Sequence, residues 1–430
     1  MKRPVGIVVL VVVAIGVLSG VAIRQREVSY AGFVDQGDAA LARDDSFAAI
    51  EAFSVAISLK GDSMAAYLKR GEAYRRRGEY DAAARDLRRA AAIDPLAIHP
   101  RELLGDIDYA MALADGGAAQ MRFSRAIDRY RESVALDDRS ARLQYKLGLA
   151  SYRAGQIGSA LTALRDAIRL DPRFAEAHYV LGMCLRAAGQ PADAVRALER
   201  AVTLAPALLA AREELADLYA SLRRFDARLP HVEALVALQP AAARERALAF
   251  AYARAGHLDR ALGQLANAAQ RYPEDRATYV ALGRLWLQRG ATGGRVEVNK
   301  ALEALDDVVG PESTSEALTL FGRALMLSGD LGRAEPALQR ATTRFPIEPS
   351  AFLYLSRVLE RRGRAAAADR ALLDYAALVP ADTLDPSLLV RIAEAHLHTG
   401  DLDAARRALA LALAKDPSNA SAHALKPRLQ

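Results

Sequence analysis

Apolar and charged positions follow one pattern in the first 25 residues and another in the rest of the chain. Residues 5–23 form an uncharged, mostly apolar run with basic residues on both sides. At 1.5 Å per helical residue this run spans roughly 28 Å, close to the hydrocarbon thickness of a bilayer. The pattern predicts a basic N-terminus over residues 1–4 and a transmembrane signal anchor over residues 5–23.

The orientation of this anchor depends on few charges. Lys2 and Arg3 precede the run, and Arg24 and Arg26 follow it, so the positive-inside count nearly ties. The basic N-terminus favours a cytoplasmic start. The rest of the chain would then lie in the periplasm, as a single-pass protein of a bacterial inner membrane. The segment Gly20-Val21-Ala22 leaves open a cleaved signal peptide.

From residue 30 onward, small and apolar residues recur with a period close to 34. A short phrase that begins with glycine and ends with alanine appears at residues 78–83, 256–261, 329–334 and 400–405. A proline follows each final alanine by twelve residues. The period predicts eleven helix-turn-helix units, which start near Tyr30, Met64, Ile98, Ala141, Ala175, Leu209, Ala242, Arg276, Ser315, Pro349 and Pro386.

The recurring residue types explain how such units would pack. A small residue in the first helix, such as Gly71, allows close approach of the second helix, where an alanine such as Ala83 receives it. Glycine at the turn suits a left-handed helix end, and proline stops the second helix. No unit can bury its apolar face alone, so stacked units share one elongated core.

This pattern resembles the tetratricopeptide repeat (TPR), a helix-turn-helix unit of 34 residues. The resemblance covers residues 30–417 and implies an all-α solenoid, a right-handed superhelix of about eleven repeats. Residues 418–430 would form a C-terminal capping segment, which arrays of this kind need for solubility.

Three units depart from the pattern. The third is stretched by about nine residues around Ala112 to Ala119, and the eighth carries a glycine-rich loop at residues 290–295. The sixth has Arg228 where a small residue is usual, followed by Pro230 in the predicted second helix. We expect this helix to start late or to kink.

The composition offers little for catalysis. The single cysteine, Cys184, excludes a disulfide framework, an iron–sulfur cluster and a zinc-cysteine site, and the seven histidines include no metal-ligand spacing. The glycine-rich loop lacks the lysine of a phosphate-binding loop. A net charge of +6 over 430 residues is too thin to indicate nucleic-acid binding. We therefore expect a non-enzyme with no catalytic, cofactor or metal site.

In TPR proteins the inner face of each first helix commonly receives a peptide or a partner helix. The ninth position of successive repeats gives acidic residues early (Asp38, Glu72 and Asp106, with Glu102 beside them), apolar residues in the middle and arginines later. The predicted groove residues are Tyr145, Leu149, Tyr152, Tyr179, Met183 and Phe250, together with Arg246, Arg284, Arg323 and Arg357. The arginines suit an acidic segment or a C-terminal carboxylate. The alternative is a solvated face whose arginines pair with neighbouring carboxylates.

The leading functional hypothesis is a membrane-anchored scaffold that binds protein partners in its groove during assembly of a bacterial cell-envelope complex. Pilus biogenesis and polysaccharide secretion use similar architectures. A second hypothesis places the same fold on the cytoplasmic side, as an adaptor that regulates envelope synthesis. A third is RNA binding by a related helical repeat, which the half-acidic groove disfavours. The sequence leaves the partner and the oligomeric state open.

Overall fold

The computed structural model describes residues 3–114, 116–290 and 294–429, with side chains from residue 18 onward. The regular secondary structure of these residues consists of helices joined by short turns, without strands. The chain divides into two compact units, Met1–Leu218 and Tyr219–Gln430. Each unit is described separately below.

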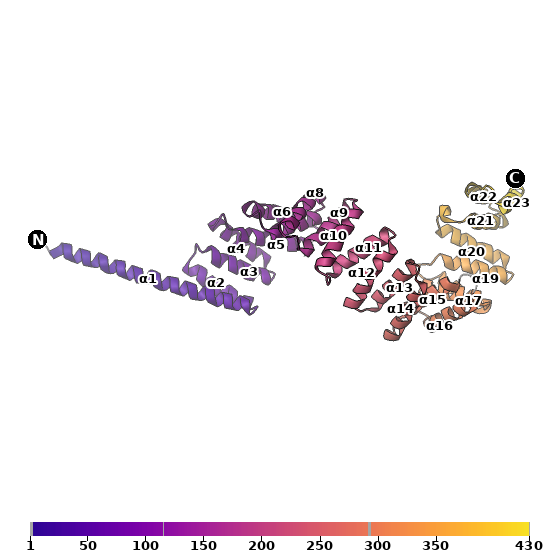
Figure 1. Ribbon diagram of the computed structural model, residues 1–430, viewed down its shortest axis with the longest axis horizontal. Coiled ribbons are helices and arrows are strands. Elements are labelled where there is room, and N and C mark those ends of the chain that lie inside the picture. Colours follow the sequence, from indigo (N-terminus) through magenta and orange to yellow (C-terminus); the bar gives the residue numbers. More distant parts are fainter. Residues whose placement is uncertain (1–2, 115, 291–293, 430) are drawn as a thin grey trace. The chain divides into compact units, whose positions relative to one another are not determined.

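The first unit contains α1 to α10 and most of α11 (Figure 1). Consecutive helices from α1 to α10 pack against one another. The helices are α1 (Arg3–Ala42), α2 (Ser46–Leu59), α3 (Met64–Arg76), α4 (Tyr80–Ile93), α5 (Ile98–Ala114), α6 (Ala119–Leu136), α7 (Ala141–Arg153), α8 (Ile157–Leu170), α9 (Ala175–Ala187), α10 (Pro191–Leu204) and α11 (Leu209–Ser221).

The second unit continues the alternation of paired helices to the C-terminus (Figure 1). Its helices are α12 (Phe225–Leu238), α13 (Ala242–Arg254), α14 (Leu258–Arg271), α15 (Arg276–Arg289), α16 (Arg295–Asp306), α17 (Ser315–Ser328), α18 (Leu331–Ala341), α19 (Ser350–Arg361), α20 (Ala365–Leu378), η2 (Ala381–Thr383), α21 (Pro386–Thr399), α22 (Leu402–Lys415), α23 (Ala420–Leu425) and η3 (Lys426–Leu429).

The predicted repeat starts agree closely with the observed helices. Each predicted start from Met64 to Ser315, and the last at Pro386, is the first residue of a helix, and α19 begins one residue after Pro349. The small residues do what the pattern requires. A Cβ atom at Gly148 would lie 2.6 Å from Cγ of Leu164, so only glycine permits this approach of α7 and α8. The turn glycines take the left-handed conformation, with φ of 75° at Gly155.

The first repeat differs from the prediction because Tyr30 does not begin a helix. It lies inside α1, which runs unbroken for 40 residues, from Arg3 to Ala42. No proline interrupts the chain between the predicted anchor and the repeat, so the helix continues. Within the described residues, no helix combines the length and the apolar character needed to cross a membrane. Residues 5–17 of the predicted anchor have side chains outside the described part of the chain.

The three irregular units are accommodated within helices. The extra residues of the third repeat lengthen α5 to 17 residues and α6 to 18. The expectation that the helix with Pro230 starts late is wrong, because α12 begins at Phe225 and contains Pro230 inside it. Buried Leu229, Val232 and Leu235 hold this helix despite the missing hydrogen-bond donor. Residues 291–293 of the predicted glycine-rich loop lie outside the described residues.

The C-terminal segment covers the last helix pair. Ala422 and Leu425 of α23 and Leu429 of η3 are buried, and the Arg406 side chain donates a hydrogen bond of 2.9 Å to the carbonyl oxygen of Leu429. The core of the last repeat is thereby closed off from solvent.

Candidate functional site

The predicted apolar patch of the first unit is one half-buried cluster. Tyr145, Leu149 and Tyr152 on α7 lie with Tyr179 and Met183 on α9, over a buried core that includes Leu164 and Val180. The Tyr145 ring also contacts Phe174, with centroids 4.8 Å apart. Burial is the main reason that the pKa values of Tyr145 and Tyr179 are raised. These side chains therefore contribute to packing between repeats as well as to the exposed surface.

The acidic positions of the early repeats are paired with basic side chains. Asp38 bonds with Lys69, and Glu72 forms an ion pair with Arg76 at 2.9 Å. Lys146 donates to Asp106 and to Glu102 at 2.7 Å each. The sequence pattern identifies these four carboxylates but not the cations that neutralise them within the protein.

The four predicted arginines of the second unit fall into two groups. Arg246 on α13 pairs with Asp275, and Arg284 on α15 pairs with Glu316, as the alternative of neighbouring ion pairs predicts. Arg323 on α17 and Arg357 on α19 instead lie over the ring of Tyr354, 5.5 and 5.8 Å from its centroid. Neither of these two forms an ion pair with a carboxylate of the described residues.

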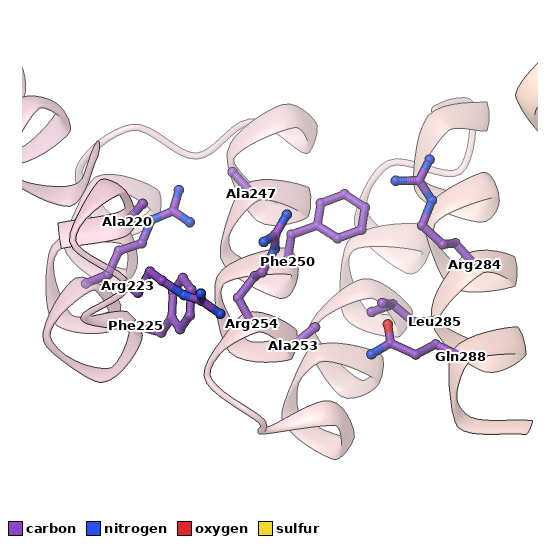
Figure 2. Close-up of a pocket in the computed structure, with 11 residues that line it drawn as sticks. Ala220, Arg223, Phe225, Ala247, Phe250, Ala253, Arg254, Arg284, Leu285 and Gln288 are labelled. Carbon is purple, nitrogen blue, oxygen red and sulfur yellow. The ribbon is translucent and has the colours of Figure 1, made fainter. Parts of the chain in front are cut away.

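A cavity of about 1080 Å³ lies in the second unit beside Arg284. It is formed by the end of α11, the turn that follows, and helices α12, α13 and α15 (Figure 2). Its lining residues are Ala220, Arg223, Phe225, Arg228, Ala247, Phe250, Ala253, Arg254, Arg284, Leu285 and Gln288. We call this the arginine cavity, because four arginines line it and no aspartate or glutamate does.

Figure 2 shows the lining side chains in three groups. Arg223 and Phe225 come from the turn and the start of α12, Phe250 and Arg254 from α13, and Arg284 from α15. The Phe250 ring extends from α13 toward α15, and the Arg284 guanidinium lies 5.7 Å from its centroid. The arrangement combines aromatic surface with positive charge.

Three of the four arginines lack a charged partner. Arg223, Arg228 and Arg254 form no ion pair within the described part of the chain, whereas Arg284 has Glu316. The Nε atom of Arg228 is buried and has no hydrogen-bond partner there either. A guanidinium in this state binds carboxylate groups well, because its planar donors match two carboxylate oxygens.

Sequence reasoning identified only Phe250 and Arg284 of this cavity. Arg223 occupies the turn position that glycine holds in other repeats, with φ of 57°. Arg228 is the fourth residue of α12, where other repeats have a buried alanine, for example Ala261 in α14. The sequence shows the anomaly at Arg228, but together with Pro230 it predicts only a disturbed helix and not a binding residue.

The described residues contain little that suggests catalysis. No group of three or more metal-ligating side chains is present among them. Cys184 is buried in the core below the apolar patch, and burial raises the pKa of its thiol to about 12. A thiol with this pKa is not a nucleophile at neutral pH.

Paired helices, a small residue where the two helices approach closely and a period near 34 residues define a helical-repeat protein. The family model for the tetratricopeptide repeat matches residues 34–98, 145–208 and 319–386. The chain therefore contains tetratricopeptide repeats, which generally form scaffolds for protein–protein interaction rather than enzymes. Comparison with functionally curated proteins gave no match.

Several solved structures are similar to parts of the chain. A crystal structure of MamA protein is 24% identical, covers 42% of this chain and 93% of its own, and has a TM-score of 0.37. Pseudomonas aeruginosa pilF is 22% identical over 50% of this chain and 95% of its own, with a TM-score of 0.40. A crystal structure of the APC/C hetero-tetramer Cut9-Hcn1 is 15% identical, covers 93% of this chain and 96% of its own, and has a TM-score of 0.43.

Proposed function

We propose that this protein is a membrane-anchored scaffold whose second unit captures an acidic segment of a partner protein. The observation that carries the proposal is the arginine cavity, which has four arginines, two phenylalanines and no carboxylate in its lining. Charge-assisted hydrogen bonds from guanidinium groups would hold the acidic side chains. Phe225 and Phe250 would contact the apolar parts of the same segment.

The half-exposed tyrosines of the first unit support a wider role as a scaffold. Tyrosine, methionine and arginine are enriched where proteins bind one another, and Tyr145, Tyr152, Tyr179 and Met183 remain half-exposed on α7 and α9. The first unit would add contacts to a partner or bind a second one. A protein with two such surfaces can bring components of an assembly together.

Membrane anchoring by residues 5–23 is part of this proposal. The supporting observation is the uncharged run itself, which is long enough to cross a bilayer as a helix. Anchoring in the bacterial inner membrane with the repeats in the periplasm fits assembly of a cell-envelope complex. The continuous helix α1 would join the anchor to the first repeat without a flexible linker.

The capture of acidic segments can be tested with a defined probe. A fluorescent peptide with three glutamates in a glycine-serine background should bind the purified full-length protein, and its lysine counterpart should not. Replacing both Arg228 and Arg254 by glutamine should weaken binding at least about tenfold, because two charge-assisted hydrogen bonds are lost. The matched control is the double variant Arg370→Gln and Arg407→Gln, which removes the same charge at exposed positions of α20 and α22 and should change binding much less.

Fluorescence anisotropy gives the dissociation constants. Equal weakening by the two pairs of substitutions would show only a general charge effect, and an acidic peptide that does not bind at all would refute capture at this cavity. Circular dichroism melting must show that both double variants remain folded.

The location can be tested independently by protease protection in spheroplasts with a C-terminal tag. If protease added outside sealed inner membranes removes the tag, the repeats face the periplasm. If the tag survives until the membrane is lysed, the repeats are cytoplasmic, and the role as an adaptor for envelope synthesis replaces envelope assembly. A tag that is not recovered with the membrane fraction would refute the anchor.

A further inference from the structure

A second cavity of about 380 Å³ lies beside the arginine cavity in the same unit. Phe250 and Arg284 line both cavities. The floor of the second cavity is apolar, with Val280 and Ala281 of α15 and Ala317 of α17. We call it the apolar cavity.

The charges around the apolar cavity differ from those of the arginine cavity. Glu312 and Glu316 line it together with Arg246, Arg276 and Arg284. Arg246 is bonded to Asp275 and Arg284 to Glu316, so its rim is largely neutralised within the protein. An acidic ligand would gain little there, whereas an apolar side chain could occupy the uncharged floor.

Arg284 is a charged side chain that both cavities share. It lies over the Phe250 ring and, of the four arginines of the arginine cavity, is the one that pairs with a carboxylate of the described residues. Both members of the Arg284–Glu316 pair are partly exposed, with 47% and 41% of their side chains accessible. A pair so exposed is weak, so an arriving carboxylate can replace Glu316 at low cost.

From these contacts we infer that the ligand is bipartite, with acidic side chains in the arginine cavity and one bulky apolar side chain of the same segment in the apolar cavity. Glu316 acts as an internal competitor that holds Arg284 until the ligand carboxylate replaces it. This inference rests on the proposed capture of acidic segments and adds the second determinant of the ligand. The occupant follows from the charges of the two linings. The arginine cavity has three arginines without an ion pair among the described residues and no carboxylate, whereas the apolar cavity has only Arg276 in this state and also holds Glu312 and Glu316.

A peptide series tests the apolar determinant. The reference is the three-glutamate peptide, and four further peptides carry one leucine placed one to four residues after the last glutamate. At least one placement should bind about tenfold more tightly than the reference, because burying one leucine side chain favours binding by this amount or more. No gain at any placement would overturn the inference, while binding of the reference peptide alone would leave the proposed function standing.

Two substitutions test whether the leucine side chain binds in the apolar cavity. Ala277 is exposed at the rim of the apolar cavity, so Ala277→Trp should fill the cavity without disturbing the core. This change should remove the gain from leucine and leave binding of the reference peptide unchanged. Ala243→Trp, at an exposed position of α13 outside both cavities, is the matched control. A leucine gain that persists in Ala277→Trp would overturn the assignment.

The competition of Glu316 with the ligand carboxylate for Arg284 can be measured separately. Glu316→Gln frees Arg284 and should strengthen binding of the reference peptide about threefold. Glu303→Gln removes the same charge at an exposed position of α16 and corrects for the change in overall charge. Equal effects of the two substitutions would show that Glu316 does not compete with the ligand.

Discussion

Glu102 on α5 gives the sharpest prediction for the first unit, because it is a buried carboxylate held by cations from another repeat. Its side chain is 4% exposed. It accepts hydrogen bonds from Arg142 at 2.8 Å and from Lys146 at 2.7 Å, both on α7. Glu102→Gln keeps the shape of the side chain and removes its charge, so the substitution isolates the electrostatic part of this contact.

The size of the effect follows from the pKa of Glu102. Burial by itself raises this pKa, but hydrogen bonds with His99 and Lys146 and the charges of Lys146 and Arg142 lower it from 4.5 to about 2. The difference of about 2.5 units, at 1.36 kcal/mol per unit, corresponds to about 3 kcal/mol at neutral pH. We therefore expect Glu102→Gln to lower the free energy of local opening by roughly 2–4 kcal/mol at pH 7.

The pH dependence has a definite sign. A folded-state pKa below the unfolded value means that the stabilisation is complete above about pH 4.5 and is lost as the pH falls toward 2. At pH 3 Glu102 remains largely ionised in the folded state but is protonated in the unfolded state. The difference between the wild type and Glu102→Gln should therefore shrink by about 2 kcal/mol from pH 7 to pH 3.

Hydrogen exchange followed by mass spectrometry can measure the change in the free energy of local opening at α5 and α7. A local method is appropriate because repeat arrays open in parts rather than as one unit. Peptides from α5 and α7 should exchange roughly 30-fold faster or more in Glu102→Gln at pH 7, after correction for intrinsic rates. The exposed Glu132→Gln on α6 is the matched control and should change exchange little. A loss equal at pH 3 and pH 7, or equal in both variants, would refute the reasoning.

Two further predictions concern packing. Gly322→Ala on α17 should lower the melting temperature, at a cost of about 1–3 kcal/mol, because the new Cβ would lie 2.5 Å from Cγ of Leu338. The control Gly263→Ala should not lower it, because a Cβ there meets nothing within 4 Å. Equal melting temperatures of the two variants would contradict the close packing at Gly322. The Cys184 thiol, with its pKa of about 12, should react with a thiol reagent at pH 8 only after denaturation, and rapid reaction of the folded protein would contradict its burial.

Most of the fold was predictable because the repeat encodes its packing in single residues. Gly182, for example, has to be small, since a Cβ there would lie 2.6 Å from Cγ of Leu198 on the partner helix. The same constraint applies at Gly71, Gly148, Gly283 and Gly322, so small residues recur with the period of the repeat. The continuity of α1 was not predictable in the same way, because the change from apolar to amphipathic sequence near residue 24 marks no break in the backbone.

The site was only partly predictable, because position within a repeat does not give the partner of a side chain. Arg246 and Arg323 were both predicted to line the groove, but Arg246 meets Asp275 and Arg323 meets Tyr354. Both partners lie about one repeat further along the chain. Their contact depends on the stacking of adjacent units, which the pattern of one unit does not specify.

The arginine cavity lies where the sixth repeat departs from the common pattern. In α14 and α18 the fourth residue is a fully buried alanine, Ala261 and Ala334, whereas in α12 it is Arg228. A buried guanidinium nitrogen without a partner lowers stability unless a ligand or another group compensates for it. Replacing Arg228 by alanine should therefore raise the melting temperature and weaken binding of the acidic peptide. This opposite response of stability and binding is expected of a residue retained for function, and not of one that merely fills space.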